Sequence, residues 1–112
     1  MSCVFCNIVK KEIPSSIVFE SDNILAFHDI SPQAPIHIVV ITKEHYSSSK
    51  ELSAKKPHLV TTLFTSILEI VTRLRLNKGY RVVTNIGEDG GQTVDHVHFH
   101  ILGGRQLNWP PG

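Results

Sequence analysis

The 112-residue sequence predicts an α+β domain in which a mainly antiparallel sheet of about five strands packs against one long helix, with a second, short helix at the N-terminus. Short segments rich in β-branched and apolar residues are typical of strands. One long stretch instead repeats apolar residues at steps of three and four, which is typical of a helix. A chain of this length fits one compact unit, so we expect residues 1–112 to form a single domain.

The first half of the chain supplies the short helix and three strands. Residues 3–10 are expected to form a helix that ends before Pro14, because a proline disfavours helix in the residue preceding it. The polar residues 21–23 are typical of a turn between two strands. Residues 31–35, with two prolines, predict a rigid loop. The expected strands are Ile17–Glu20, Ile24–His28 and residues 37–42.

The second half supplies the long helix and two more strands. Pro57 suits the first turn of the helix and Gly79 lies just beyond its end. The residues with helical spacing are Leu59, Val60, Leu63, Phe64, Ile67, Leu68, Val71 and Leu74. Residues 80–85 and 94–102 predict strands separated by a glycine-rich loop at 87–92, and the proline-rich tail is expected to lack regular structure. His58 is expected to face solvent at the helix start.

Composition and charge exclude several classes of function. Lys and Arg number 11 against 10 Asp and Glu, without a basic patch that would track a nucleic-acid duplex. No apolar run approaches the length of a membrane span, and the N-terminal residues do not resemble a signal peptide. These features predict a cytoplasmic protein, with a nuclear location also allowed. In that compartment Cys3 and Cys6 are expected to be free thiols or metal ligands rather than a disulfide.

The segment containing His96, His98 and His100 is the most informative. Side chains in a strand alternate between faces, so these three rings are expected to share one face at a spacing of about 6–7 Å. The interleaved apolar residues Val97, Phe99 and Ile101 would pack against the long helix. Three imidazoles at this spacing can surround one phosphate-sized group.

Histidine reaches both protonation states near neutral pH, so such a strand offers a nucleophile beside hydrogen-bond donors without a metal. Backbone N–H groups of the loop at 87–92 and the Thr93 hydroxyl would stabilise charge on phosphate oxygens. Two alternatives remain open for the histidines. They are ordinary packing residues, or they are zinc ligands, as alternating strand histidines often are.

These residues resemble the histidine triad (HIT) family, whose signature is His-x-His-x-His, and within it the histidine triad nucleotide-binding (Hint) branch, the purine nucleoside phosphoramidases. Gly-Gly-Gln precedes the triad at 90–92 and Trp-Pro-Pro-Gly follows it at 109–112, a specific combination. The resemblance also covers residues 5–20, 25–35 and 103–108, and therefore most of the chain.

The resemblance implies a HIT-like fold and a hydrolase. The enzyme would cleave the P–N bond of purine nucleoside 5′-phosphoramidates, or acyl and aminoacyl adenylates, and release AMP or GMP. His98 would be the nucleophile that becomes covalently nucleotidylated, and His100 would contact the phosphate. His37 and His96 would support the nucleophile from behind. No cofactor would be required for the chemistry.

The resemblance also implies a nucleotide site and a partner. Asp29 would hold the ribose hydroxyls. The phosphate and leaving-group site would be lined by Asn85, Gly91, Gln92 and Thr93. The base would be walled by Phe5, Ile8, Phe27, His28 and Ile30. Two copies would form a continuous sheet, with Trp109 near the partner's site. Thr93 replaces a serine common in this branch, and Asn108 stands where a relative carries histidine.

Cys3 and Cys6 form a Cys-x-x-Cys pair, which on its own is a weak signal for a redox pair, metal ligands or simple packing. The resemblance extends to members in which such a pair, with the residues corresponding to His45 and His96, completes a structural zinc site. Three hypotheses follow from the sequence. The first is the nucleophilic hydrolase, the second a zinc-dependent hydrolase with the triad as ligands, and the third a nucleotide-binding interaction protein.

Overall fold

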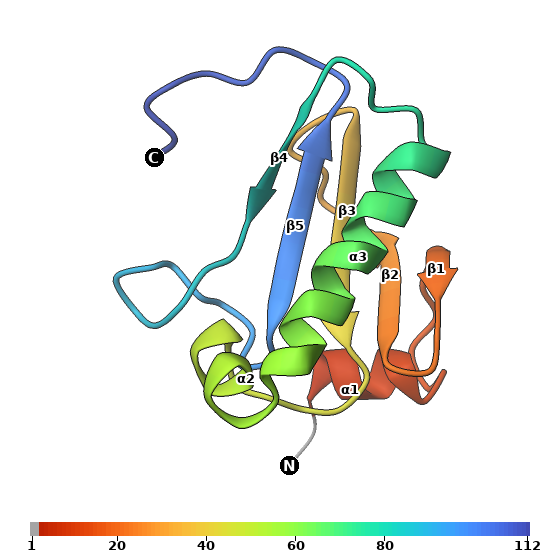
Figure 1. Ribbon diagram of the computed structural model, residues 1–112, viewed down its shortest axis with the longest axis vertical. Coiled ribbons are helices and arrows are strands. Elements are labelled where there is room, and N and C mark those ends of the chain that lie inside the picture. Colours follow the sequence, from red (N-terminus) through yellow and green to blue (C-terminus); the bar gives the residue numbers. More distant parts are fainter. Residues whose placement is uncertain (1–2) are drawn as a thin grey trace.

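The computed structural model of the protein describes residues 3–112 and contains a five-stranded sheet in the order β1-β2-β3-β5-β4 (Figure 1). Each neighbouring pair of strands is antiparallel. The strands are β1 (Ile17–Glu20), β2 (Ile24–His28), β3 (Ile36–Thr42), β4 (Tyr80–Val83) and β5 (His98–Gly103). This architecture confirms the predicted fold class.

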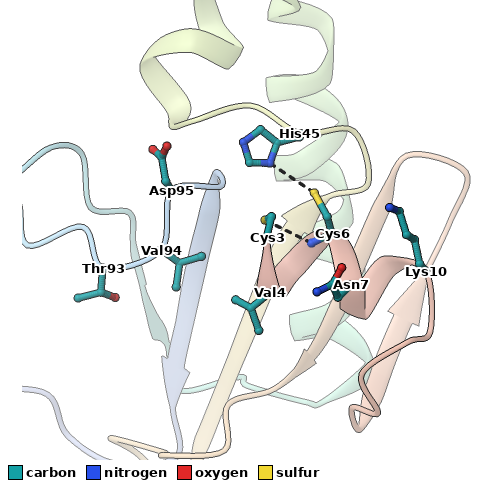
Figure 2. Close-up of a pocket in the computed structure, with 9 residues that line it drawn as sticks. All are labelled: Cys3, Val4, Cys6, Asn7, Lys10, His45, Thr93, Val94 and Asp95. Carbon is teal, nitrogen blue, oxygen red and sulfur yellow. Dashed lines mark hydrogen bonds between the residues drawn. The ribbon is translucent and has the colours of Figure 1, made fainter. Parts of the chain in front are cut away.

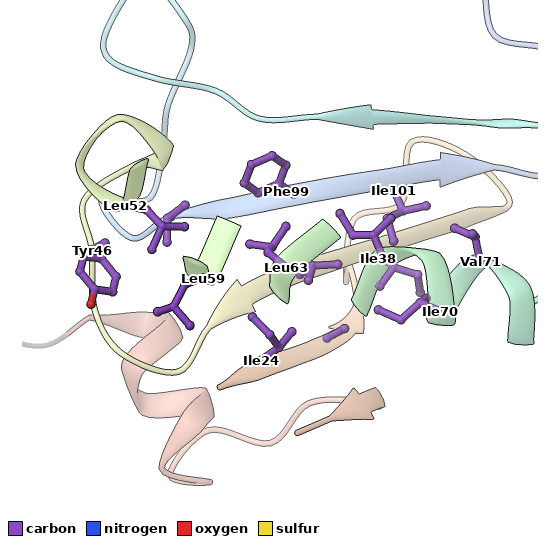
Figure 3. Close-up of a cluster of buried hydrophobic side chains, with 14 residues drawn as sticks. Ile24, Ile38, Tyr46, Leu52, Leu59, Leu63, Ile70, Val71, Phe99 and Ile101 are labelled. Carbon is purple, nitrogen blue, oxygen red and sulfur yellow. The ribbon is translucent and has the colours of Figure 1, made fainter. Parts of the chain in front are cut away.

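Two helical layers flank the sheet. The helices are α1 (Val4–Val9), α2 (Ser49–Lys55) and α3 (Pro57–Arg73). The long helix α3 crosses one face of the sheet, and α1 lies near one end of it (Figure 1). Between α3 and the sheet is the larger apolar cluster, which includes Ile24, Ile38, Leu63, Phe99 and Ile101 (Figure 3). The alternate residues of the same strands pack with α1 in a smaller cluster of Ile8, Leu25, Phe27, Val39 and Ile41.

The predicted bounds of β1 and β2 are confirmed, and the long helix begins at Pro57 as expected. Helix α2 was not predicted, although its start signal is present in the sequence. Ser48 caps the helix by accepting a hydrogen bond from the backbone N–H of Lys50, and the carboxylate of Glu51 accepts one from the N–H of Ser47. A serine followed three residues later by glutamate is a capping-box pattern.

The prediction that strand 94–102 begins at residue 94 was wrong, because β5 begins only at His98. The preceding residues instead follow the loop after β3. The His96 ring donates to the carbonyl of Thr42 at 2.8 Å, and the N–H of Val97 donates to the carbonyl of Tyr46 at 2.7 Å. The strand predicted at 80–85 is also shorter, since β4 ends at Val83.

Within residues 3–112, none of the helices has the length and hydropathy needed to cross a membrane.

Candidate nucleotide-binding and metal site

A cavity of about 270 Å³ opens on the α1 face of the sheet. Nine of the residues predicted to bind nucleotide line it, namely Phe5, Ile8, Phe27, His28, Asp29, Ile30, Thr93, His98 and His100. Sequence reasoning missed Val4, Ile13, Pro14, Ser15, Val39 and Val94, which line it too. The cavity therefore gathers residues from α1, the turn after it, β2, β3 and β5.

His98 is buried at the start of β5 and is oriented by one backbone group. Its Nδ1 lies 2.7 Å from the carbonyl oxygen of His96. A carbonyl only accepts, so Nδ1 carries the proton and donates it. The other nitrogen, Nε2, is then unprotonated in the neutral ring and keeps the lone pair that a nucleophile requires.

A chain of hydrogen bonds fixes the protons of two more histidines. The backbone N–H of Gln33 donates to Nδ1 of His37 at 3.0 Å, so the proton of the neutral His37 ring is on Nε2. That Nε2–H donates to Nδ1 of His100 at 2.8 Å. The neutral His100 ring therefore carries its own proton on Nε2, where it can donate to a bound anion. Its ring centroid is 5.1 Å from that of His98.

Burial favours the uncharged forms of His37 and His100. Burial lowers the pKa of His37, against an opposing effect of the Asp29 carboxylate. Burial is also the main cause that lowers the pKa of His100, with smaller contributions from His98 and His37. Asp29 itself accepts from the N–H of Ser31 at 2.8 Å through Oδ1, and its Oδ2 lies 3.4 Å from His37 Nε2. This half-buried carboxylate lines the cavity and can accept from hydroxyl groups.

The glycine-rich loop is held by its own side chains. Asn85 donates to the carbonyl of Gly90 at 2.7 Å. Gln92 accepts from the N–H of Gly87 at 3.0 Å and donates to the carbonyls of Ser47 and Val94. Asn85, Gly91 and Gln92 do not line the cavity formed by the described residues, and only Thr93 from this part of the predicted site does. The amides of Asn85 and Gln92 thus shape the loop beside the cavity.

A second cluster lies at the other side of α1 and contains Cys3, Cys6, His45 and His96, whose ligand atoms all lie within 4.8 Å of one another. Figure 2 shows three of them, with Cys6 pointing toward His45. His96 Nδ1 lies 3.1 Å from His45 Nδ1, 3.4 Å from Cys3 Sγ and 3.6 Å from Cys6 Sγ. A fourth distance, from Cys6 Sγ to His45 Nδ1, is 3.4 Å.

Three of these four distances fit a zinc ion, and the fourth, 3.1 Å between the two Nδ1 atoms, is slightly short. A tetrahedral zinc with Zn–N of about 2.0–2.1 Å and Zn–S of about 2.3 Å holds its ligand atoms roughly 3.3–3.8 Å apart. The bond from His96 Nε2–H to Thr42 leaves Nδ1 unprotonated and facing the two thiols, as a ligand must be. Burial lowers the pKa of His96 and so favours that neutral ring. The donor set and its geometry therefore suit a closed structural site.

The three triad histidines separate into different surroundings. His96 belongs to the thiol cluster, whereas His100 groups with Asp29 and His37 in a second set of residues close enough to hold a metal. His98 belongs to neither set among the described residues. The rings of the triad thus do not gather around one metal ion, which disfavours the hypothesis that the whole triad ligates zinc.

The C-terminal tail leaves Trp109 81% exposed, and Figure 1 shows the tail projecting from the body of the domain. The tail is attached where the guanidinium of Arg81 donates to the carbonyl of Asn108 at 2.8 Å. His58 is exposed at the start of α3, as predicted.

Relatives match almost the whole chain. The 14 kDa zinc-binding protein of Zea mays is 45% identical over 111 residues, which cover 97% of this chain and 87% of that protein. The adenylylsulfatase HINT1 of Arabidopsis thaliana is 45% identical over 112 residues, covering 97% of this chain and 76% of the relative.

Solved structures agree in fold. A HIT family hydrolase from Legionella pneumophila has a TM-score of 0.95 and 43% identity, with 99% of this chain and 100% of that chain covered. A histidine triad nucleotide-binding protein from Candida albicans has a TM-score of 0.84 and 31% identity, with 97% and 83% covered. The family model of the HIT domain matches residues 10–107. This chain therefore belongs to the HIT family.

Proposed function

We propose that the protein is a nucleotide-binding hydrolase of the Hint branch that cleaves the P–N bond of purine nucleoside 5′-phosphoramidates through a covalent intermediate on His98. Acyl and aminoacyl adenylates are included because they present the same phosphorus to the same nucleophile. The observation that carries the proposal is the His98 ring, whose Nδ1 donates to His96 and whose Nε2 keeps its lone pair beside the cavity.

In the first step, Nε2 of His98 attacks the phosphorus and the bond from phosphorus to the leaving nitrogen breaks. The leaving nitrogen takes up a proton from solvent and departs as an amine. The His100 Nε2–H donates to a phosphate oxygen, where charge develops, because its Nδ1 already accepts from His37. The Thr93 hydroxyl lines the same cavity and is available to the leaving group.

In the second step, water attacks the phosphorus of the nucleotidyl-histidine. The bond from phosphorus to His98 Nε2 breaks, the water releases a proton to solvent that balances the one taken up in the first step, and AMP or GMP is released. The His98 ring returns to its starting tautomer because the His96 carbonyl still accepts from Nδ1. The cycle is complete without a redox change or a metal-bound intermediate.

The remaining cavity suits a nucleoside. The rings of Phe5 and Phe27 meet edge to face at a centroid distance of 5.7 Å and provide an apolar wall for a base. Asp29 accepts from the ribose hydroxyls. The names of the relatives from Candida albicans and Arabidopsis thaliana, a nucleotide-binding protein and an adenylylsulfatase, support a nucleotide as the bound group.

The experiment measures hydrolysis of adenosine 5′-phosphoramidate and binding of AMP by wild type and His98→Ala. The variant should lose turnover by about 10⁴-fold or more, as removal of a nucleophile does, while AMP still binds. Asn77→Ala, in an exposed turn outside the cavity, is the matched control and should keep normal turnover. Normal turnover by His98→Ala would reject the assignment.

A structural zinc is the second part of the proposal, with Cys3, Cys6, His45 and His96 as its ligands. Zinc bound there would join α1 to the loop after β3 and to the segment before β5. The zinc-binding relative from Zea mays supports this assignment. Metal analysis of the purified protein should find about one zinc per chain, and a Cys6→Ser variant should contain less. Protein purified without any zinc would remove the idea.

We also propose a homodimer joined through the β4 edge of the sheet. Within residues 3–112, β4 pairs only with β5, so its other edge is unpaired. Phe64 packs against Phe99 of β5 at a centroid distance of 5.5 Å, so its side of α3 faces the β5 and β4 end of the sheet. Phe64 and Leu68 are one turn apart and are 48% and 61% exposed. In a dimer joined at the β4 edges, the partner subunit would cover these two side chains.

A further inference from the structure

Helix α1 lies between the thiol cluster and the nucleotide cavity and contributes to both. Cys3 and Cys6 belong to the cluster, whereas Phe5 lines the cavity. The Phe5 ring stands edge-on to His98 at a centroid distance of 5.1 Å and to His96 at 5.8 Å. One turn of helix thus carries two prospective metal ligands and the aromatic ring that packs against the nucleophile.

His96 connects the same two sites through its backbone. Its imidazole faces the two thiols, and its carbonyl oxygen accepts the hydrogen bond from His98 Nδ1. The two groups that orient His98, the Phe5 ring and the His96 carbonyl, therefore both belong to segments that carry metal ligands.

The cavity beside the thiol cluster and the nucleotide cavity share three lining residues. A cavity of about 560 Å³ lies beside the thiol cluster and is lined by Val4, Thr93 and Val94 (Figure 2). The same three residues line the nucleotide cavity. A change in how α1 sits against residues 93–94 would alter both cavities at once.

We propose that zinc in the thiol cluster and a purine nucleotide in the cavity bind cooperatively, with Phe5 as the positioning residue that couples them. This rests on the proposed function. Helix α1 has six residues, too few to be stable alone, and takes its order from its surroundings. Zinc holds one side of α1 and the nucleotide packs against the other. Each ligand therefore lowers the ordering cost of binding the other.

The test measures two equilibria on the intact protein. Calorimetry gives the Kd of AMP for the zinc-loaded and the zinc-free protein, and competition with a chromogenic chelator gives the Kd of zinc with and without saturating AMP. We expect each Kd to fall by at least about fivefold when the other ligand is present, and by the same factor in both directions. A Kd of AMP that does not change with zinc would overturn the linkage and leave the proposed function standing.

Two substitutions on α1 locate the coupling. Phe5→Ala should still bind zinc, but its zinc affinity should no longer respond to AMP supplied at saturation for that variant. Val9→Ala is the matched control, because Val9 packs on the same apolar cluster without lining the cavity, and its linkage should equal that of the wild type. Full linkage retained in Phe5→Ala would overturn the role of Phe5, even if zinc-free protein proves to be unfolded.

Failure of the two proposals can be told apart. Zinc-loaded wild type that binds no AMP would contradict the proposed function and the linkage together. AMP binding and turnover with zinc-independent affinity would contradict the linkage alone.

Discussion

The two faces of the sheet are built from the same strands but carry different kinds of residue. On the α3 face, Val40, Phe99 and Ile101 are buried in an apolar cluster. On the α1 face, His37, His98 and His100 alternate with them on the same strands. The α3 face is thus entirely apolar at these positions. The α1 face combines the smaller apolar cluster with polar groups that are held in fixed orientations for chemistry.

The largest expected effect is a loss of folding stability from a substitution on the α3 face. Ile101 is completely buried against the α3 side, so Ile101→Ala should lower the free energy of unfolding by about 2–5 kcal/mol. Urea denaturation measures this change. The molecules that remain folded should keep the wild-type specific activity. A lower activity per folded molecule would show that the α3 face also contributes to the chemistry.

A substitution of His100, the neighbour of Ile101 on the α1 face, should mainly lower turnover. His100→Ala removes the proposed donor to the phosphate and should lower kcat by about 10²–10³-fold. It also removes the acceptor of the buried His37 Nε2–H, so the free energy of unfolding should fall by about 1–3 kcal/mol. Steady-state kinetics and denaturation of the same preparation test this. Because His100 and Ile101 are adjacent on β5, backbone location is matched between the two variants. A purely structural role for His100 would make unfolding easier but preserve turnover per folded molecule.

The exposed side of α3 that carries Phe64 and Leu68 extends the comparison to the proposed dimer. Leu68 is exposed on the helix whose other side forms the core, so Leu68→Glu should spare folding. Its charge would be buried in a dimer, and the dimer Kd should rise at least about tenfold, which is about 1.4 kcal/mol. Sedimentation velocity over a concentration series measures the Kd. A wild type that stays at 12.5 kDa at every concentration would contradict the dimer itself.

The smallest expected effect is the pH dependence of stability. Burial lowers the pKa of His37 and His100 below the ordinary 6.5, so the unfolded chain binds protons that the folded protein excludes. Their contribution to stability is therefore complete above about pH 6.5 and is lost as the pH falls toward the lowered values. His100→Asn should show a shallower loss of stability between pH 7.5 and 5.5 than wild type. His58→Gln, at an exposed position, serves as the control and should keep the wild-type slope.

Local patterns predicted the sheet and its two faces well. Alternation along β5 correctly separates His98 and His100 from Phe99 and Ile101, because strand geometry fixes side-chain direction from sequence position alone. The apolar spacing of α3 correctly includes the buried Leu59, Leu63, Ile67 and Val71. It also includes Phe64 and Leu68, which are exposed, and omits the buried Ile70. The capping pattern at Ser48 was available and would have revealed α2.

Contacts between distant segments were beyond local patterns. Val94 lies just before the alternating residues 96–101 and was therefore included in the predicted strand. The hydrogen bond from the His96 ring to the carbonyl of Thr42, 54 positions away, instead keeps His96 outside β5. The tautomers of His37 and His100 likewise depend on the N–H of Gln33. Only the resemblance, and not spacing, associated Cys3 with His96, which lies 93 residues away.

The central claim is that His98 bonds covalently to phosphorus, and the most direct measurement traps that bond. Protein mixed with an adenosine 5′-phosphoramidate, quenched within the turnover time and digested under non-acidic conditions is analysed by mass spectrometry. The account predicts an adenylate on the peptide with His96, His98 and His100, localised to His98 by fragmentation and absent from His98→Ala. Rapid turnover with unmodified peptide at every quench time, or adenylate on a different residue, would contradict it.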